Sequence, residues 1–245
     1  AAFYRFLSVV MVESVKNLSM SRHELQKRIQ IKNPEFAEQL YKKGESMVLI
    51  SGHFHNWEWL ITAMPLLIPH QVIGIGTPLS NSFWNSQLNS LRSRFGLKVV
   101  HANTYKQQLQ SAKTPLAVIT LSDQSPPKAH TSYWTRFLNQ PTAVAYGPEK
   151  MALEYQLNPV FCEITKLKPG YYSVTLIPFP DSTNKWEYGA ITEWHTRLLE
   201  TRIQKEPAFW LWSHRRWKHQ PPPSTEEWKK HQLEIFNQRF KQPNK

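Results

Sequence analysis

The chain has 245 residues, of which 40% are apolar; this suffices for one α/β domain with a good-sized core and excludes disorder as the default. Its formal net charge of +12 favours anionic partners, namely nucleic acid, a phosphate-bearing lipid surface or an acidic carrier protein, with a merely basic soluble protein as the alternative. Ten tryptophans fit a lipid headgroup surface at least as well as nucleic acid, and the single Cys162 excludes an intrachain disulfide and favours a reducing compartment.

The first 43 residues are predicted to be helical, because apolar positions recur at helical spacing and no glycine precedes Gly44. No run approaches the roughly 20 apolar residues that a membrane-spanning helix needs. The longest N-terminal candidate, residues 1–12, contains Arg5 and lacks the cleavage pattern of a signal peptide. Because the chain begins at Ala1 and not at Met, our hypothesis is that the natural N-terminus, with or without a membrane anchor, precedes Ala1.

Short apolar runs alternate with helical patterns through the middle of the chain. A long functional loop is predicted from Asp123 to Thr142, and Lys168-Pro169-Gly170 is a natural hairpin turn between two late strands. The predicted strands are 47–50, 72–75, 97–100, 116–121, 159–164 and 171–177, and the predicted helices are 56–65, 80–95, 104–112, 149–156 and 191–204.

This alternation predicts an α/β fold with a mostly parallel sheet covered by helices on both faces, and the late hairpin makes the sheet mixed. We expect a single domain made of an N-terminal helical segment (1–43), a core that holds the site (44–220) and a polar, basic tail (221–245). The sequence has no internal repeat and no Gly-rich phosphate loop.

The segment Ser51–Glu58 holds the strongest candidates for chemistry. It follows a buried strand and opens a helix, which is where open α/β sheets place their sites. We predict that the chain folds the Glu58 carboxylate back onto the His53 imidazole. A carboxylate on one ring nitrogen leaves the other free to take a proton, so His53 would act as a general base.

Two alternatives remain open for this segment. His53 could be a structural histidine hydrogen-bonded near a turn. It could instead bind a metal together with His55, with His101 and Asp123 recruited as further ligands, although no convincing ligand cluster follows at useful spacing.

Several blocks in order resemble the late acyltransferases of lipid A biosynthesis, the lauroyl/myristoyl transferase family within the glycerolipid and lysophospholipid acyltransferase superfamily. The hallmark of that group, a histidine and an acidic residue separated by four positions, is matched by His53 and Glu58. The resemblance covers roughly residues 40 to 220. The further matching blocks are Leu91–Gly96, Ser122–Pro126, Phe137–Thr142, Gly147–Ala152 and Trp210–Lys218.

The resemblance implies a glycerolipid acyltransferase-like fold, an acyl thioester donor (acyl carrier protein or CoA), a lipid hydroxyl as acceptor and no cofactor. His53 would deprotonate the acceptor, and Glu58 would stabilise the imidazolium. The tetrahedral oxyanion needs preorganised donors, for which backbone amides after the motif, Arg92 and Arg94 are candidates. Many members carry a basic residue near 77–79, where this chain has Thr-Pro-Leu, so that role has moved to Arg92 or Arg94 or the acceptor differs.

Other candidates lie in the later blocks. Asp123 and Gln124 belong to an Asp-Gln loop, where Asp123 either orients the acceptor or an arginine, or is an ordinary turn residue. Arg215 and Arg216 form either a clamp for headgroup phosphate or a solvated basic stripe. The tryptophans at 210, 212 and 217 are expected to pack in the core rather than contact ligand.

The resemblance implies a location at the cytoplasmic face of the bacterial inner membrane, an anionic membrane surface and acyl carrier protein as partners, and no nucleic acid. The acceptor could instead be a lysophospholipid, another glycolipid or an aminolipid. A basic, aromatic-rich nucleic-acid-binding protein and a metal hydrolase are the rival classes; the first explains charge and tryptophan content but not the position of His53 and Glu58 after a buried strand.

Overall fold

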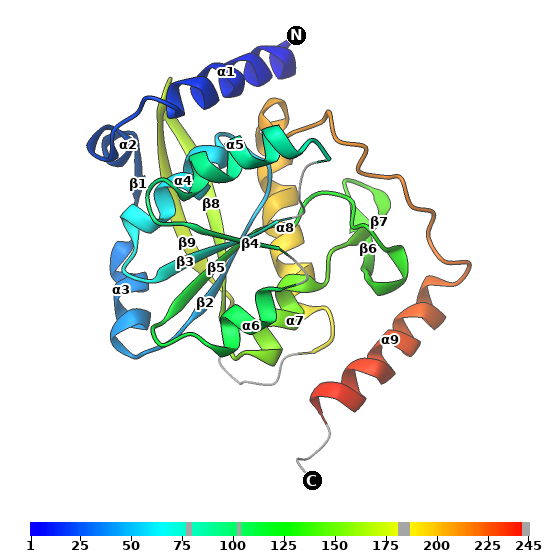
Figure 1. The fold of residues 1–245 in the computed structure, drawn as a ribbon. Coiled ribbons are helices and arrows are strands. Elements are labelled where there is room, and N and C mark those ends of the chain that lie inside the picture. Colours follow the sequence, from blue (N-terminus) through cyan, green and yellow to red (C-terminus); the bar gives the residue numbers. More distant parts are fainter. Residues whose placement is uncertain (77–79, 102–103, 181–186, 242–245) are drawn as a thin grey trace.

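The computed structural model describes residues 1–76, 80–101, 104–180 and 187–241. A seven-stranded sheet in the order β1-β9-β8-β2-β5-β3-β4 forms its centre (Figure 1). All neighbouring strands are parallel except β8 and β9, which form an antiparallel hairpin. The strands are β1 (Ile29–Ile31), β2 (Met47–Ser51), β3 (Gln71–Gly76), β4 (Lys98–His101), β5 (Leu116–Leu121), β8 (Asn158–Lys168) and β9 (Tyr171–Pro178). The predicted mostly parallel, mixed sheet is confirmed.

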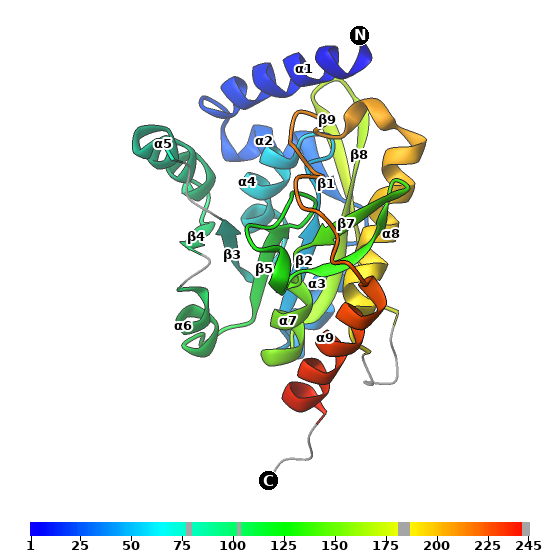
Figure 2. The ribbon, with the colours of Figure 1, turned by 90° about the vertical axis from the view of Figure 1, so that its right-hand side faces the viewer.

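Helices cover both faces of the sheet (Figures 1 and 2). Successive side chains of a strand point to opposite faces, so Leu49 of β2 packs in the same core as Leu60, whereas Ile50 packs with Met151 and Ile191 on the other side. The helices of the described residues are α1 (Ala2–Asn17), α2 (Arg22–Arg28), α3 (Pro34–Lys42), α4 (Trp57–Leu67), α5 (Ser82–Ser93), α6 (Tyr105–Gln110), α7 (Gly147–Glu154), α8 (Ala190–Lys205) and α9 (Thr225–Phe240).

Three segments differ from the sequence-based prediction. The N-terminal 43 residues are not wholly helical, because β1 pairs in parallel with β9 at the sheet edge; three residues are too few to show a periodic pattern. The second half of the predicted loop forms a hairpin of β6 (Tyr133–Phe137) and β7 (Gln140–Val144), whose turn at Leu138 and Asn139 has positive φ at both residues, as in type I′ turns. The basic tail contains α9.

A buried carboxylate attaches α1 to the rest of the fold. Glu13 accepts hydrogen bonds from the Asn56 side-chain amide (2.6 Å) and the Tyr172 hydroxyl (2.7 Å). Asn56 also caps α4 by accepting a hydrogen bond from the backbone N–H of Trp59 (2.9 Å). The position of α1 is therefore tied to the start of the helix that follows His53.

A second buried carboxylate fixes the start of α8. Glu149 accepts hydrogen bonds from the backbone N–H groups of Gly189 (2.6 Å) and Thr192 (2.8 Å), the unsatisfied donors of a helix N-terminus. Gly189 has φ 86°, and an added Cβ would collide with the Tyr133 ring, so glycine is required there. No helix in the described part of the chain is long and apolar enough to cross a bilayer.

Candidate active site

The site forms where two adjacent parallel strands end. Ser51, the last residue of β2, lies opposite Leu121, the last residue of β5. The chain then continues into His53 on one side and Asp123 on the other. The carboxyl ends of parallel strands share one edge of the sheet, so two side chains that are 70 residues apart in sequence meet there.

Asp123 holds the His53 ring in a defined orientation. The ring Nδ1–H donates to Asp123 Oδ1 at 2.7 Å, and the backbone N–H of His53 donates to Oδ2 at 2.8 Å. Trp210 Nε1–H also donates to Oδ2 at 2.8 Å. Asp123 is only 5% exposed. Burial raises its pKa, but attraction to His53 and these hydrogen bonds outweigh burial and lower the pKa to about 2.

The other ring nitrogen of His53, Nε2, does not bind the carboxylate. With Nδ1 protonated toward an ionised carboxylate, Nε2 carries the lone pair. It lies 3.3 Å from the Gln124 side-chain nitrogen, which can donate to it. The His53 side chain is 16% exposed, and its ring meets Trp57 edge to face at 5.2 Å. A hydroxyl group that reaches the unprotonated Nε2 can therefore transfer its proton to an oriented imidazole.

Glu58 does not occupy the position predicted for it. Its carboxylate binds Arg92 through two hydrogen bonds, from Nε at 3.0 Å and Nη2 at 2.5 Å, and also accepts from Trp57 Nε1–H at 3.2 Å. The carboxylate on His53 Nδ1 belongs to Asp123 instead. Glu58 lies in the first turn of α4, and its bidentate pair with Arg92 links α4 to the last turn of α5.

The segment 209–219, here the C-terminal strap, follows α8 and binds both loops of the site. Leu211 N–H donates to His53 O and His55 N–H donates to Phe209 O, both at 3.0 Å, so the strap pairs with the site loop like a short strand. Ser125 N–H donates to His214 Nε2 at 2.9 Å, which joins the strap to the loop after β5. The strap thus fixes both segments that carry the His53–Asp123 pair.

The predicted arginines separate into different environments. Arg94 donates to the carbonyl oxygens of Asn17 and Leu18 (3.0 Å to Leu18), so it satisfies the C-terminus of α1 and is not directed at His53. Arg215 is exposed, whereas Arg216 is only 3% exposed and lines a cavity behind Asp123. The two arginines predicted either as a phosphate clamp or as a solvated stripe therefore lie in different environments, and only Arg215 is at the surface.

The metal hypothesis for His55 finds no ligand set. Among the described residues, no three His, Cys, Asp or Glu side chains are grouped so that they could hold a metal ion. His55 is buried against Phe209, with its Nε2 3.5 Å from a Glu206 carboxylate oxygen. Burial, followed by the charges of Arg202 and Lys166, lowers its pKa to about 3, which keeps it neutral at physiological pH.

Other predicted features have mixed outcomes. Trp210 is buried as expected, but its indole N–H also binds Asp123 directly, a role that sequence reasoning missed. Trp212 and Trp217 are partly exposed. The Thr-Pro-Leu segment at 77–79 lies outside the described residues. A signal for the Asp123 role was present, since Asp123 follows its buried strand by two residues, as His53 does.

Comparison with known proteins was made at two levels. The sequence model described as bacterial lipid A biosynthesis acyltransferase matches residues 2–219, which is nearly the whole chain. A search of curated proteins finds no match.

Proposed function

This chain belongs to the bacterial lipid A biosynthesis acyltransferase family, which makes it an acyl-transferring enzyme with a lipid acceptor, and on that premise we propose its catalytic groups and partners. We propose that it moves a fatty acyl group from an acyl thioester to a hydroxyl of a lipid A precursor. In this proposal His53 is the general base, and Asp123 in place of Glu58 is the carboxylate that orients it.

The observation that carries the proposal is the Nδ1–Asp123 contact of 2.7 Å, which leaves Nε2 as the ring nitrogen that can accept a proton. Nε2 takes the proton of the acceptor hydroxyl as its oxygen attacks the thioester carbonyl. The tetrahedral oxyanion then collapses, the carbon–sulfur bond breaks, and the imidazolium returns the proton to the leaving thiolate. Asp123 remains ionised and stabilises the imidazolium throughout.

Gln124 is proposed as a contributor to oxyanion stabilisation. Its side-chain nitrogen lies 3.3 Å from His53 Nε2, so a substrate bound to Nε2 also lies near this amide. Arg92 is proposed to position α5 through its pair with Glu58. Removing one preorganised oxyanion donor costs about 3–4 kcal/mol in the transition state, which is the scale expected if Gln124 has this role.

We further propose that the end of the molecule that carries α1 faces an anionic membrane, at the cytoplasmic face of the inner membrane. Large apolar side chains are exposed on α1 and α5, where Val12 is 69% and Trp84 62% exposed. Phe209 of the strap packs edge to face on Phe6 of α1, so the site loop lies close to this end. The exposed set is Tyr4, Met11, Val12, Val15, Leu18, Phe83 and Trp84.

Acyl carrier protein is the proposed donor. The net charge of +12 favours encounter with an acidic protein through long-range attraction that salt screens. Acyl-CoA is the alternative donor, and equal rates with both donors at low and high salt would contradict a dedicated carrier-protein site.

The test is acyl transfer from an acyl thioester to a panel of acceptors that includes a lipid A precursor, a lysophospholipid and an aminolipid. We expect turnover on the lipid A precursor and a loss of about 10²–10⁴-fold in His53→Ala. His23→Ala, which removes an exposed histidine of α2, is the control and should match the wild type. Turnover that survives His53→Ala in a folded protein would remove His53 from the mechanism, and transfer only to another lipid would correct the acceptor.

A further inference from the structure

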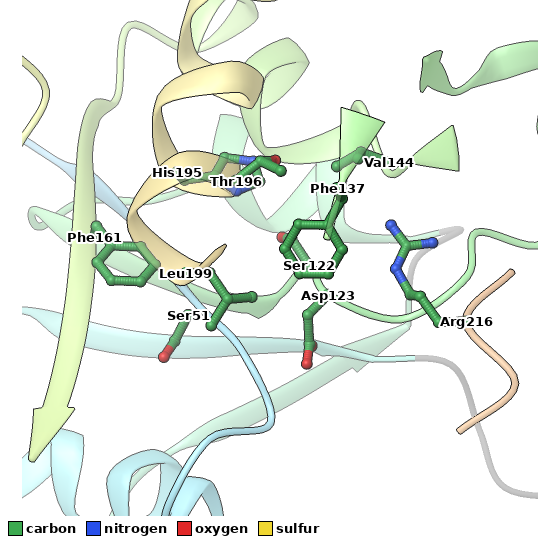
Figure 3. A pocket seen from close by; sticks show the side chains of 10 residues that line it. All are labelled: Ser51, Ser122, Asp123, Phe137, Val144, Phe161, His195, Thr196, Leu199 and Arg216. Atoms are coloured by element: carbon green, nitrogen blue, oxygen red, sulfur yellow. The ribbon is translucent and has the colours of Figure 1, made fainter. Parts of the chain in front are cut away.

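A small cavity with both polar and apolar walls is lined in part by Asp123 (Figure 3). Its volume of about 10 Å³ is on the scale of one water molecule. Figure 3 shows lining side chains that come from the ends of β2 and β5, from α8 and from the C-terminal strap. Apolar groups such as Phe137 and Leu199 close the remaining sides.

Three side chains in the cavity wall carry buried polar atoms without a partner in the described part of the chain. These atoms are His195 Nε2, Thr196 Oγ1, and both Nε and Nη1 of Arg216. His195 and Thr196 are adjacent on α8, and Arg216 comes from the strap. Buried polar atoms are nearly always hydrogen-bonded, so four such atoms on three side chains around one cavity point to a shared polar partner.

Arg216 is the most unusual of the three. Only 3% of its surface is exposed, and it forms no ion pair within the described residues. Its guanidinium carbon lies 5.9 Å from the centre of the Phe137 ring. This cation–π contact offsets only part of the free-energy cost of burying the charge. A buried cation without a nearby anion is strongly unfavourable, and Asp123 is the carboxylate with which it shares the cavity.

We propose that Arg216, His195 and Thr196 hold one ordered water molecule in this cavity, and that Arg216 is a positioning residue whose charge adds to the groups that favour an ionised Asp123 behind His53. The inference rests on the proposed role of Asp123 as the partner of the base. A water with three hydrogen bonds to protein is typical of buried sites. It would satisfy the Arg216 donors and the His195 acceptor at once, without placing a second carboxylate beside Asp123.

The charges around Asp123 determine what the loss of Arg216 should do. His53 faces it from the loop after β2, His195 from α8, and both His214 and Arg216 from the strap. Burial lowers the pKa of His195 to about 3, so this ring is neutral at the pH of the assay. Arg216 is then the permanent cation of the group, and its charge favours ionised Asp123.

The experiment is an NMR titration of the Asp123 carboxyl carbon in labelled protein. Arg216→Met should shift the Asp123 midpoint upward by roughly 0.5–1 pH unit, because a nearby positive charge that favours the ionised carboxylate is removed. Arg215→Met removes the same charge from the neighbouring exposed position and should leave the midpoint unchanged, since solvent screens that charge. Arg216→Lys should keep the midpoint close to that of the wild type.

Equal midpoints for Arg216→Met and Arg215→Met would overturn the proposed electrostatic role. If Arg216→Met does not fold, the same comparison is made with Arg216→Gln and Arg216→Lys. A crystal structure that resolves waters tests the second part: solvent density bonded to Arg216 and His195 supports it, and Arg216 paired directly with a carboxylate overturns it. The titration needs no turnover, so a wild type that transfers no acyl group would contradict the proposed function and leave this test intact.

Discussion

The side of the site that contacts the C-terminal strap and the side formed by α1 and α5 differ in what their polar groups bind. Behind His53, the side that contacts the C-terminal strap buries Asp123, Trp210 and Arg216 and directs three donors at one carboxylate. The α1 and α5 side instead exposes large apolar side chains, with Trp84 62% exposed. Its polar contacts, such as Glu58 with Arg92, connect helices and do not reach His53.

The two acidic residues near His53, Asp123 and Glu58, therefore have separate roles. A buried carboxylate with all its hydrogen bonds made orients the base before substrate arrives, as preorganised catalysis requires. A carboxylate at a helix–helix contact fixes the shape of the substrate side instead.

The largest expected effect is on turnover. Asp123→Asn should lower turnover by about 10²–10⁴-fold, because the amide can no longer fix the tautomer with a charged acceptor. Glu58→Gln, with the same change of group, should lower it only about tenfold, or about 1.4 kcal/mol, through a misplaced α5. Steady-state rates with one acyl thioester compare the two, and a larger loss in Glu58→Gln would restore the pairing predicted from the sequence.

Substitution of Gly52 tests how tightly the residues around Asp123 are packed. An added Cβ would lie 2.8 Å from Leu199 Cδ2 and 3.3 Å from Asp123 Cγ. Gly52→Ala should therefore lower the free energy of unfolding by about 1–3 kcal/mol and reduce turnover by displacing Asp123. Gly76→Ala, where an added Cβ meets nothing within 4 Å, is the control for chemical denaturation. Equal stability of the two variants would mean that Leu199 yields without cost.

The pH dependence of stability tests the buried carboxylate itself. The folded pKa of Asp123, about 2, lies below its unfolded value, so its contribution is present above pH 4 and is lost as pH falls toward 2. The contribution of Asp123 to the free energy of unfolding above pH 4 is therefore about 2 kcal/mol. The difference in unfolding free energy between wild type and Asp123→Asn should shrink over that window. A difference that stays constant from pH 6 to pH 2.5 would show that Asp123 is not held ionised by the fold.

The smallest effect is expected on membrane binding by the exposed apolar side chains of α1 and α5. Trp84→Ser should weaken binding to anionic vesicles several-fold, through the loss of about 1–2 kcal/mol of apolar burial. Ile235→Ser removes an exposed apolar side chain from α9, at the opposite end of the molecule from α1 (Figures 1 and 2), and should not change binding. Equal losses in both variants, or binding that ignores salt, would contradict a specific membrane-facing end.

The sequence by itself determined the α/β class, most strands and helices, and the position of His53 at the carboxyl end of a buried strand. These features depend on local patterns, since continuous apolar runs such as β5 and the Asn56 cap of α4 act over a few residues. It missed β1 and the β6–β7 hairpin because short edge strands and a turn at Leu138-Asn139 carry little periodic signal.

Which carboxylate binds His53 depends on the tertiary structure. Glu58 is five residues away in sequence, yet the first turn of α4 directs it toward Arg92. Asp123 is 70 residues away, yet the parallel register of β2 with β5 brings it to 2.7 Å. Strand order and register depend on packing across the whole sheet, and no local spacing encodes them. For the same reason the burial of Arg216 could not be predicted, because the residues that line its cavity come from distant segments of the chain.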